Sequence, residues 1–462
     1  MLKTLINAFK VKEIRNKIFM MLLLLLIFRL GCFIPVPGLD GSTFSGAVES
    51  NDFLTLMSSI TGGALSQGTL FALGIGPYIN ASIILQLLCV GIPALERLSK
   101  QGEEGRKKIA QITRYVTIGL AIIQSVGIII SFAGNGISGA SFDKKVLDIF
   151  GEKEWLLGCF MAILYTAGAL VVMWIGERIT DYGVGNGQSM IIFVGIISTA
   201  GTQVFAKLRA IFDSTFRINQ FGAQTTNTDI IVELVFFALI CVLVFFAIVF
   251  VDLSERKVPV QYAKQIRGRK MYGGQSSAIP IRISGGGVMP LIFAFSILSF
   301  PQMICSMVDP NGNGWFTKFW NTWMSASVNN VSGNIEWYHR LVYALVLCVL
   351  IFAFSFFYAQ MQFNPEDVSK SIQQNGGFIQ GIRPGKATEA YLKKISNRIT
   401  LFGAIYLSLV AFIPSVAFSW ASYTLVNVFS TTGILIVVSC AMELEKQLQA
   451  QLMMKNYKGF LK

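Results

Sequence analysis

The sequence has few of the residues from which catalytic centres are built. It contains one histidine, His339, in 462 residues, and only 14% of the chain is charged. One histidine excludes an HExxH metal site, which needs two on one helix face. The strings GxSxG, GxGD and GxxxxGK[ST] are also absent, so neither a hydrolase nor a nucleotide-binding motif is present. If the protein performs a process that needs energy, that energy must come from a partner or from a gradient.

Cysteine is present without a pattern. The spacing of the seven cysteines matches neither a metal site nor a disulfide framework, and each lies in or beside an apolar run. We interpret them as small hydrophobic residues: Cys32, Cys89, Cys159, Cys241, Cys305, Cys348 and Cys440.

Hydrophobic residues dominate what is present. They form 53% of the chain, and the mean hydropathy of +0.59 is too high for an ordinary soluble protein of this length. Runs of about 20 apolar residues cross a bilayer, and ten such runs predict an all-α polytopic membrane protein. The expected spans are 18–36, 72–93, 113–133, 155–175, 189–206, 230–252, 287–307, 341–361, 398–417 and 424–442.

Positive charge is concentrated on one side of these spans. Most of the 38 lysines and arginines lie in the connections on the side of the two termini, which the positive-inside rule places in the cytoplasm. Residues 1–17 are basic and lack a cleavage pattern of small residues, so we expect a retained cytosolic arm. Connections 253–286 and 362–397 are longer than a return turn needs. Their basic residues either only fix orientation or dock an acidic partner, such as RNA or an acidic protein surface.

The backbone is loosest in an apolar stretch, from Gly62 to Leu88. Each glycine weakens a helix by roughly 1 kcal/mol and proline by roughly 3 kcal/mol, so we expect a short first piece, a bend near Pro77 and then a helix. Broken segments survive in a bilayer only where protein or a water-filled cavity surrounds them. The stretch therefore indicates a pathway through the membrane.

Two of the softened segments resemble each other. When "GIGPYINASI" and "GGVMPLIFAFSI" are aligned on Pro77 and Pro290, Ile79 falls on Ile292. Segments five spans apart predict two inverted five-helix halves, although chance similarity between apolar segments is an alternative. We find no carboxylate near the middle of a span, as an ion-coupled transporter would need. The one clearly internal charge, Arg29, either pairs with a polar group or extends towards the interface.

Motifs along nearly the whole chain resemble the SecY/Sec61 alpha family of protein-conducting channels. They include "FRLGCFIPVPGLD", "GGALSQGTLFALGIGPYINASIILQLL", "GERITDYGVGNG" and "YAKQIRGRKMYGGQSSAIPIRI", followed by "FNPEDVSKSIQQNGGFIQGIRPGKATEAYL". The resemblance implies a clamshell of two pseudo-symmetric halves, 18–206 and 230–442, around a central pore. An external connection, 207–229, would join the halves, and 443–462 would be a cytosolic tail. A small, loosely helical plug at about 62–70 would close the pore.

The resemblance also assigns roles to individual residues. The pore ring would consist of Ile75, Ile79, Ile192, Ile292 and Ile436. The plug would include Gly62, Gly63, Ala64, Leu65, Gly68 and Leu70. Polar contacts across a lateral gate would be Asn80, Gln124 and Ser296, and residues that dock a motor or ribosome would be Arg267, Arg269, Lys270 and Arg383. Two positions depart from the family pattern: Gln188, at a sixth ring position that is usually aliphatic, and Gln380, where proline is common.

The function that the resemblance implies is passive protein translocation in the bacterial plasma membrane, without a cofactor. Unfolded preproteins would cross the membrane, and transmembrane segments would leave sideways into lipid. The implied partners are the SecE and SecG subunits, the SecA ATPase, the ribosome, signal peptides and preproteins, and membrane lipids, with SecDF and YidC as additional candidates. The alternatives are a secondary transporter for a small solute and an intramembrane scaffold that binds ribosomes.

Overall fold

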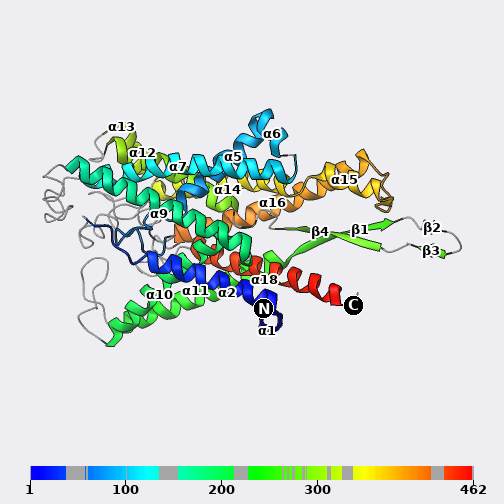
Figure 1. Cartoon of the computed structure of the whole chain (residues 1–462), viewed down its shortest axis with the longest axis horizontal. Coiled ribbons are helices and arrows are strands. Elements are labelled where there is room, and N and C mark those ends of the chain that lie inside the picture. The colour runs from blue at the N-terminus through cyan, green and yellow to red at the C-terminus, as the bar shows by residue number, and fades with distance from the viewer. Residues whose placement is uncertain are drawn as a thin grey trace.

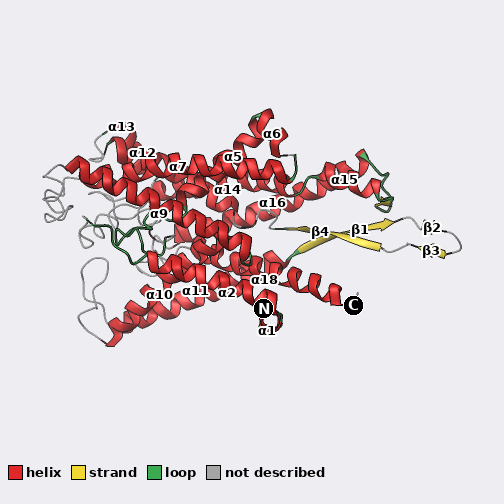
Figure 2. Cartoon of the chain, in the orientation of Figure 1, coloured by secondary structure: helices red, strands yellow, loops and turns green. Residues whose placement is uncertain are grey.

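The computed structural model describes most of the chain, and helices make up most of that part (Figure 2). The described residues are 2–37, 58, 61–99, 101–134, 154–212, 227–262, 265–267, 270–272, 276–283, 287, 289–309, 314–324, 337–417 and 431–459. The helices are α1 (Leu2–Lys10), α2 (Lys12–Gly31), α5 (Gly76–Gly91), α6 (Pro93–Ser99), α7 (Glu103–Gly134), α9 (Glu154–Tyr182), α10 (Gly187–Phe212), α11 (Asn227–Leu253), α12 (Met289–Val308), α13 (Trp315–Trp323), α14 (Trp337–Gln362), α15 (Pro365–Gln374), α16 (Lys386–Ala417) and α18 (Thr431–Gly459).

Each of the ten expected spans overlaps a helix, and residues 424–430 of the last span lie outside the described residues. The helices are α2, α5, α7, α9, α10, α11, α12, α14, α16 and α18. Within the described residues, five helices are long and apolar enough to cross a membrane, or six if α5 and α6 form one span. The axes of α5 and α6 meet at 106°, at a break just before Pro93. The count of ten spans therefore stays a prediction.

A small amount of β structure extends from one end of the helical bundle (Figure 1). Strands β1 (Glu255–Tyr262) and β4 (Ser276–Arg282) form an antiparallel hairpin, and β5 (Gly377–Phe378) pairs with the other edge of β1, which gives the order β4-β1-β5. Short strands β2 (Gln265–Arg267) and β3 (Lys270–Tyr272) pair near the tip of the hairpin. Both chain termini lie towards this end of the molecule, whereas α13 lies at the opposite end.

The helices form two groups that meet along two lines. In the first group, α7 packs against α5 and α9, while α2 and α10 pack against α9; in the second, α14 packs against α12 and α16, while α11 packs against α18. Along one line, α12 of the second group contacts α5 and α7, and along the other, α10 contacts α11 and α18. The two prolines of the proposed repeat occupy equivalent places, because Pro77 and Pro290 both lie in the first turn of a helix, α5 and α12 respectively.

The largest cluster of buried side chains lies where these groups meet. It includes residues of α2, α5, α9, α10, α11, α12, α14, α16 and α18. Because lipid is as apolar as these side chains, close packing and hydrogen bonds, more than the hydrophobic effect, must hold such helices together in a bilayer. The middle of the bundle is therefore the place where the helices are most specifically packed.

Candidate functional site

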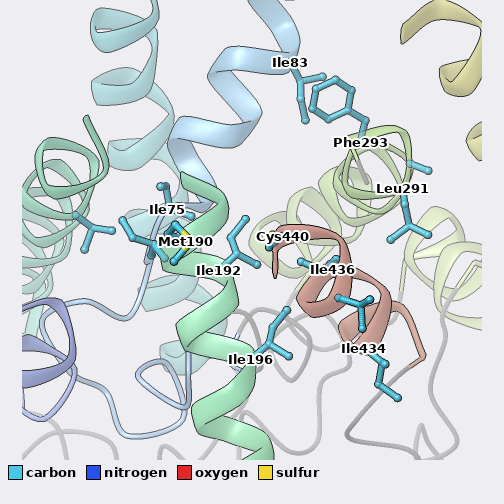
Figure 3. Close-up of a cluster of buried hydrophobic side chains, with 14 of the residues drawn as sticks. Ile75, Ile83, Met190, Ile192, Ile196, Leu291, Phe293, Ile434, Ile436 and Cys440 are labelled. Carbon is cyan, nitrogen blue, oxygen red and sulfur yellow. The ribbon is translucent and has the colours of Figure 1, made fainter. Parts of the chain in front are cut away.

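The five isoleucines of the expected pore ring all belong to this central cluster. Ile75, Ile192 and Ile436 are buried, and Ile79 and Ile292 are half-buried and pack against the same cluster. Figure 3 shows Ile192 on α10 and Ile436 on α18, with Ile75 close to the start of α5. The fold thus brings together residues that are far apart in the sequence. Four of them come from α5, α10, α12 and α18, and Ile75 is the N-cap of α5. Their role as a ring stays a prediction.

The bend expected near Pro77 is the beginning of a helix. Ile75 is the N-cap of α5, and Pro77 lies in its first turn, where the missing proline N–H costs no helical hydrogen bond. Residues 61–75 before it form turns and one isolated bridge. Ile75 is therefore held at a junction between irregular backbone and helix, and Ile79 lies one turn into the helix.

Gln188, the polar residue at the sixth ring position, is half-buried in the first turn of α10. Its backbone N–H donates to the side chain of Asn186 at 3.0 Å, which caps the start of α10. One turn further along α10, Ile192 is buried in the cluster. Replacement of Gln188 by leucine tests whether this residue belongs to the ring.

The expected plug is compact but not helical, which corrects the sequence-based expectation of a loose helix. The backbone at Gly62, Gly63 and Gly68 has φ values of 74°, 85° and 59°, and this left-handed region interrupts a right-handed helix. Two backbone hydrogen bonds tie the segment to the residues after α2: Val36 donates to Gly68 at 3.1 Å, and Leu70 donates to Ile34 at 2.9 Å.

The plug segment is buried in spite of its irregular backbone. Ala64 and Leu65 each expose only 1% of their surface, and they pack in two different clusters. Ala64 faces the central cluster, whereas Leu65 packs in a cluster that includes Met161 and Tyr165 of α9. Side-chain hydroxyls satisfy internal carbonyls, since Thr69 donates to Ala64 at 3.0 Å. Packing on two sides and satisfied backbone groups keep the segment in place.

The three polar residues expected at the lateral gate belong to α5, α7 and α12, the helices that meet along one of the two lines. Gln124 is buried on α7, and Asn80 and Ser296 are half-buried on α5 and α12. Among the described residues, no hydrogen bond joins these three side chains to one another.

A polar contact across the same boundary was missed from the sequence. The Tyr358 hydroxyl of α14 donates a hydrogen bond to Oε1 of Gln86 on α5, at 2.6 Å. Phe293 of α12 packs edge-on against Tyr358, with ring centroids 5.0 Å apart, and Figure 3 shows Phe293 beside Ile83 of α5. Gln86 and Tyr358 are isolated polar residues within apolar runs, and this is the signal that could have found the pair. The sequence does not indicate, however, that the two side chains meet.

The two long connections expected to dock a partner form one unit, which we call the docking unit (residues 255–283 and 365–395, as far as they are described). Strand β5 of the second connection pairs with β1 of the first, with Gln261 opposite Phe378. A separate apolar cluster lies beneath them and includes Val258, Val260, Ile372 and Leu392. In the second connection, α15 begins with Pro365 after the N-cap Asn364, whose side chain accepts from the Glu366 N–H.

The expected docking residues lie at two places in this unit. Arg267 and Lys270 face each other in the β2–β3 register at the tip of the hairpin, and Arg269 lies outside the described residues. Arg383 lies between β5 and α16, and its carbonyl accepts a hydrogen bond from Thr388 at 2.9 Å. Arg383 also lines an open hollow of about 550 Å³ together with Gln373, Phe378, Ile382 and Pro384.

The ion pair described in α15 of this unit joins neighbouring side chains at the exposed surface. Lys370 and Glu366 form an ion pair of 2.6 Å one turn apart on α15. The hydrogen bond to Glu366 and its charge raise the pKa of the Lys370 ammonium, which is exposed. Such exposed pairs contribute little to stability, so they leave the shape of the unit to the β1 pairing and the cluster beneath it.

Comparison with known proteins agrees with this arrangement. Residues 69–444 match the SecY family model. The chain is 39% identical to the protein translocase subunit SecY of Streptomyces coelicolor over 470 residues, and 36% identical to that of Mycobacterium tuberculosis over 475 residues, with 100% of each chain covered.

Solved structures share the fold at lower sequence identity. One is described as the structure of a protein conducting channel (TM-score 0.62, 19% identity), and another as a SecY protein whose plug domain stabilises the closed state (TM-score 0.65, 20% identity). Sec61 from a canine ribosome-channel complex also matches (TM-score 0.61, 18% identity). Each alignment covers 94% of this chain and 92% of the other. The family match over most of the chain and the full-length relatives show that this chain belongs to the SecY family.

Proposed function

We propose that this chain is the channel-forming subunit of a protein translocase in the bacterial plasma membrane. The observation that carries the proposal is the convergence of Ile75, Ile192 and Ile436 in one buried cluster, beside a segment of turns that is enclosed by helices. Polypeptides would cross through this cluster once the plug segment moves aside. The names of the curated relatives support the same function.

The chemistry of the cluster suits a polypeptide better than an ion. Aliphatic side chains make many weak dispersion contacts that adapt to whatever passes, whereas wetting an apolar constriction for ions is unfavourable. A ring of isoleucines would therefore close around a moving chain and limit ion leakage. No nucleotide is hydrolysed in this scheme, and direction comes from a partner.

The boundary between α12 and the pair α5 and α7 would be the lateral gate. A segment that is apolar enough to prefer lipid would leave here, and a polar segment would continue across the membrane. Separation of the helices must break the hydrogen bond between Tyr358 and Gln86, which adds a polar cost to opening. This contact joins Asn80, Gln124 and Ser296 as a candidate part of the gate.

The docking unit would bind the partner that supplies the energy, either the SecA ATPase or the translating ribosome. Its basic residues at the hairpin tip and Arg383 beside the hollow suit acidic protein surfaces or RNA. Two of the structural relatives, Sec61 and a yeast Ssh1 complex, are described in ribosome-bound states. SecE and SecG would complete the membrane complex, in which both termini of this chain would face the cytoplasm.

Reconstitution tests the proposal. The chain is placed in liposomes with a SecE-like subunit, and a preprotein, the motor ATPase and ATP are added. We expect protease protection of the preprotein that depends on ATP, with the same liposomes without ATP as the control. Absence of protection together with ion-driven uptake of a small solute would favour a transporter, and ribosome binding without conductance would favour a scaffold.

A further inference from the structure

The one clearly internal charge of the first expected span contacts the plug segment. Arg29 lies in the last turn of α2, and its Nη1 donates a hydrogen bond to the carbonyl oxygen of Gly62 at 2.9 Å. The guanidinium also lies over the ring of Phe33, with 5.3 Å between Cζ and the ring centroid. The arginine thus links the first membrane helix to the first turn of the plug.

An arginine at this point of a membrane span is energetically unfavourable unless it has a partner or a function. Charged side chains within a membrane span are expensive, and they persist where they have a function or a partner. Here the described partners are a backbone carbonyl and an aromatic face, and hydrogen bonds from a guanidinium are stronger than those between neutral groups. The charge also lies in the last turn of α2, where the helix dipole favours a cation.

The backbone conformation of Gly62 and the space around it accommodate this contact. The residue has a φ of 74°, and a Cβ built on it would lie 2.5 Å from Nη1 of Arg29 and 3.1 Å from Cα of Gly195. A side chain at this position would be strained by this φ value, and its Cβ would displace the end of the Arg29 side chain. Next to it, the Thr61 carbonyl lies 3.9 Å from Sγ of Cys32. Two successive carbonyls of the plug segment therefore face the end of α2.

The contact lies beside the buried part of the plug, so loss of one hydrogen bond here can change the position of the whole segment. Ala64 and Leu65, which follow closely, each expose only 1% of their surface and pack in two different apolar clusters. The plug cannot leave this place unless the Gly62 carbonyl is withdrawn from Arg29. A single hydrogen bond at its start can therefore bias the whole segment.

We propose that Arg29 is a latch for the plug: its guanidinium holds the Gly62 carbonyl in the resting channel and must release it when the plug moves. Arg29 is then a positioning residue, which acts on the pore through the plug. This inference rests on the proposed channel function. A charged hydrogen bond of this kind shifts the equilibrium between the closed and displaced plug by about 10-fold to 100-fold.

The test compares variants of the whole complex in liposomes at rest, without preprotein. Arg29→Leu removes the donor, Arg29→Lys keeps a charged donor, and Gly62→Ala keeps Arg29 but pushes the carbonyl away. Arg178→Leu is the matched control, because Arg178 lies over Trp174 and Tyr182 on α9 and has no contact with the plug among the described residues. The readouts are the resting ion leak and the rate of maleimide labelling at a cysteine introduced by Ala64→Cys, taken as the labelling in excess of the same chain without Ala64→Cys, because the chain has seven cysteines of its own.

We expect Arg29→Leu and Gly62→Ala to raise both readouts about 10-fold or more, Arg29→Lys to raise them less than Arg29→Leu, and Arg178→Leu to leave them unchanged. Wild-type leak and wild-type labelling in Arg29→Leu would overturn the latch. If the complex with Arg29→Leu does not assemble, unchanged leak and labelling in Gly62→Ala overturn it instead. ATP-dependent preprotein protection in the wild type separates the two ideas: protection with no effect of the variants refutes only the latch, and its absence refutes the channel function.

Discussion

The plug segment and the docking unit reverse the usual relation between burial and regular structure. Most of residues 61–75 are buried in the bundle, yet they form turns. The docking unit extends from the end of the bundle, yet it is built from paired strands and a capped helix (Figure 1). In most proteins the irregular segments lie outside and the regular elements inside.

The difference follows from what each region must do. An irregular segment is tolerated at membrane depth only when protein surrounds it, and a segment without helical hydrogen bonds can leave its site without unwinding a helix. A surface that recognises a large partner must instead keep its shape in water, and paired strands over an apolar cluster provide that shape. The following predictions test the packing around the plug, the docking unit and the boundary between the helix groups, in order of decreasing expected effect.

The largest effect is expected from the apolar cluster next to the plug. Replacing Ile75, Ile192 and Ile436 together by glycine removes the side chains that would close the pore, so the resting ion conductance in planar bilayers should rise by an order of magnitude or more. The matched control replaces three exposed isoleucines on other faces of the bundle, Ile122, Ile163 and Ile405. Equal conductance in the two triple variants would count against a pore ring.

A smaller effect is expected in the docking unit, since it acts through a partner. Arg383→Glu reverses the charge beside the hollow and should lower motor-dependent preprotein protection several-fold, while assembly with the SecE-like subunit is retained. Lys393→Glu makes the same change of charge at an exposed position of α16 that does not line the hollow. If protection and assembly fall together in Arg383→Glu, the residue is structural.

A still smaller effect is expected at the boundary between the two helix groups. Tyr358→Phe removes the hydrogen bond to Gln86, worth about 1 kcal/mol, so segments of lower hydrophobicity should leave sideways into lipid. The measurement is the fraction of a graded series of model segments that inserts instead of crossing. Tyr165→Phe is the control, because the buried hydroxyl of Tyr165 has no partner in the described part of the chain. The same insertion threshold in both variants would remove Tyr358 from the gate.

The smallest effect is expected at Gln188. Its side chain is half-buried one turn before Ile192, and the other expected ring positions are all isoleucine, so Gln188→Leu should change the resting ion conductance by less than about twofold. A large drop in conductance in Gln188→Leu would show instead that this polar group weakens the seal and belongs to the ring.

The sequence by itself determined the features that depend on local patterns. Apolar runs predicted where helices form, because the length and composition of a run suffice for a helix in lipid. The glycines and Pro77 predicted a bend followed by a helix, and α5 begins at Gly76 with Pro77 in its first turn. The form of the plug was predicted wrongly, because propensity shows that a helix is weak but does not show which turns replace it.

Only the tertiary structure decided which distant groups meet. The partner of Arg29 is the carbonyl of Gly62, the partner of Tyr358 is Gln86, and the partner of β1 is the two-residue strand β5. None of these pairs has a local signal, since a backbone carbonyl is the same at every residue and a polar side chain in an apolar run does not specify its partner. Such pairs form because helix packing places them within hydrogen-bonding distance, where a buried polar group without a partner would be costly.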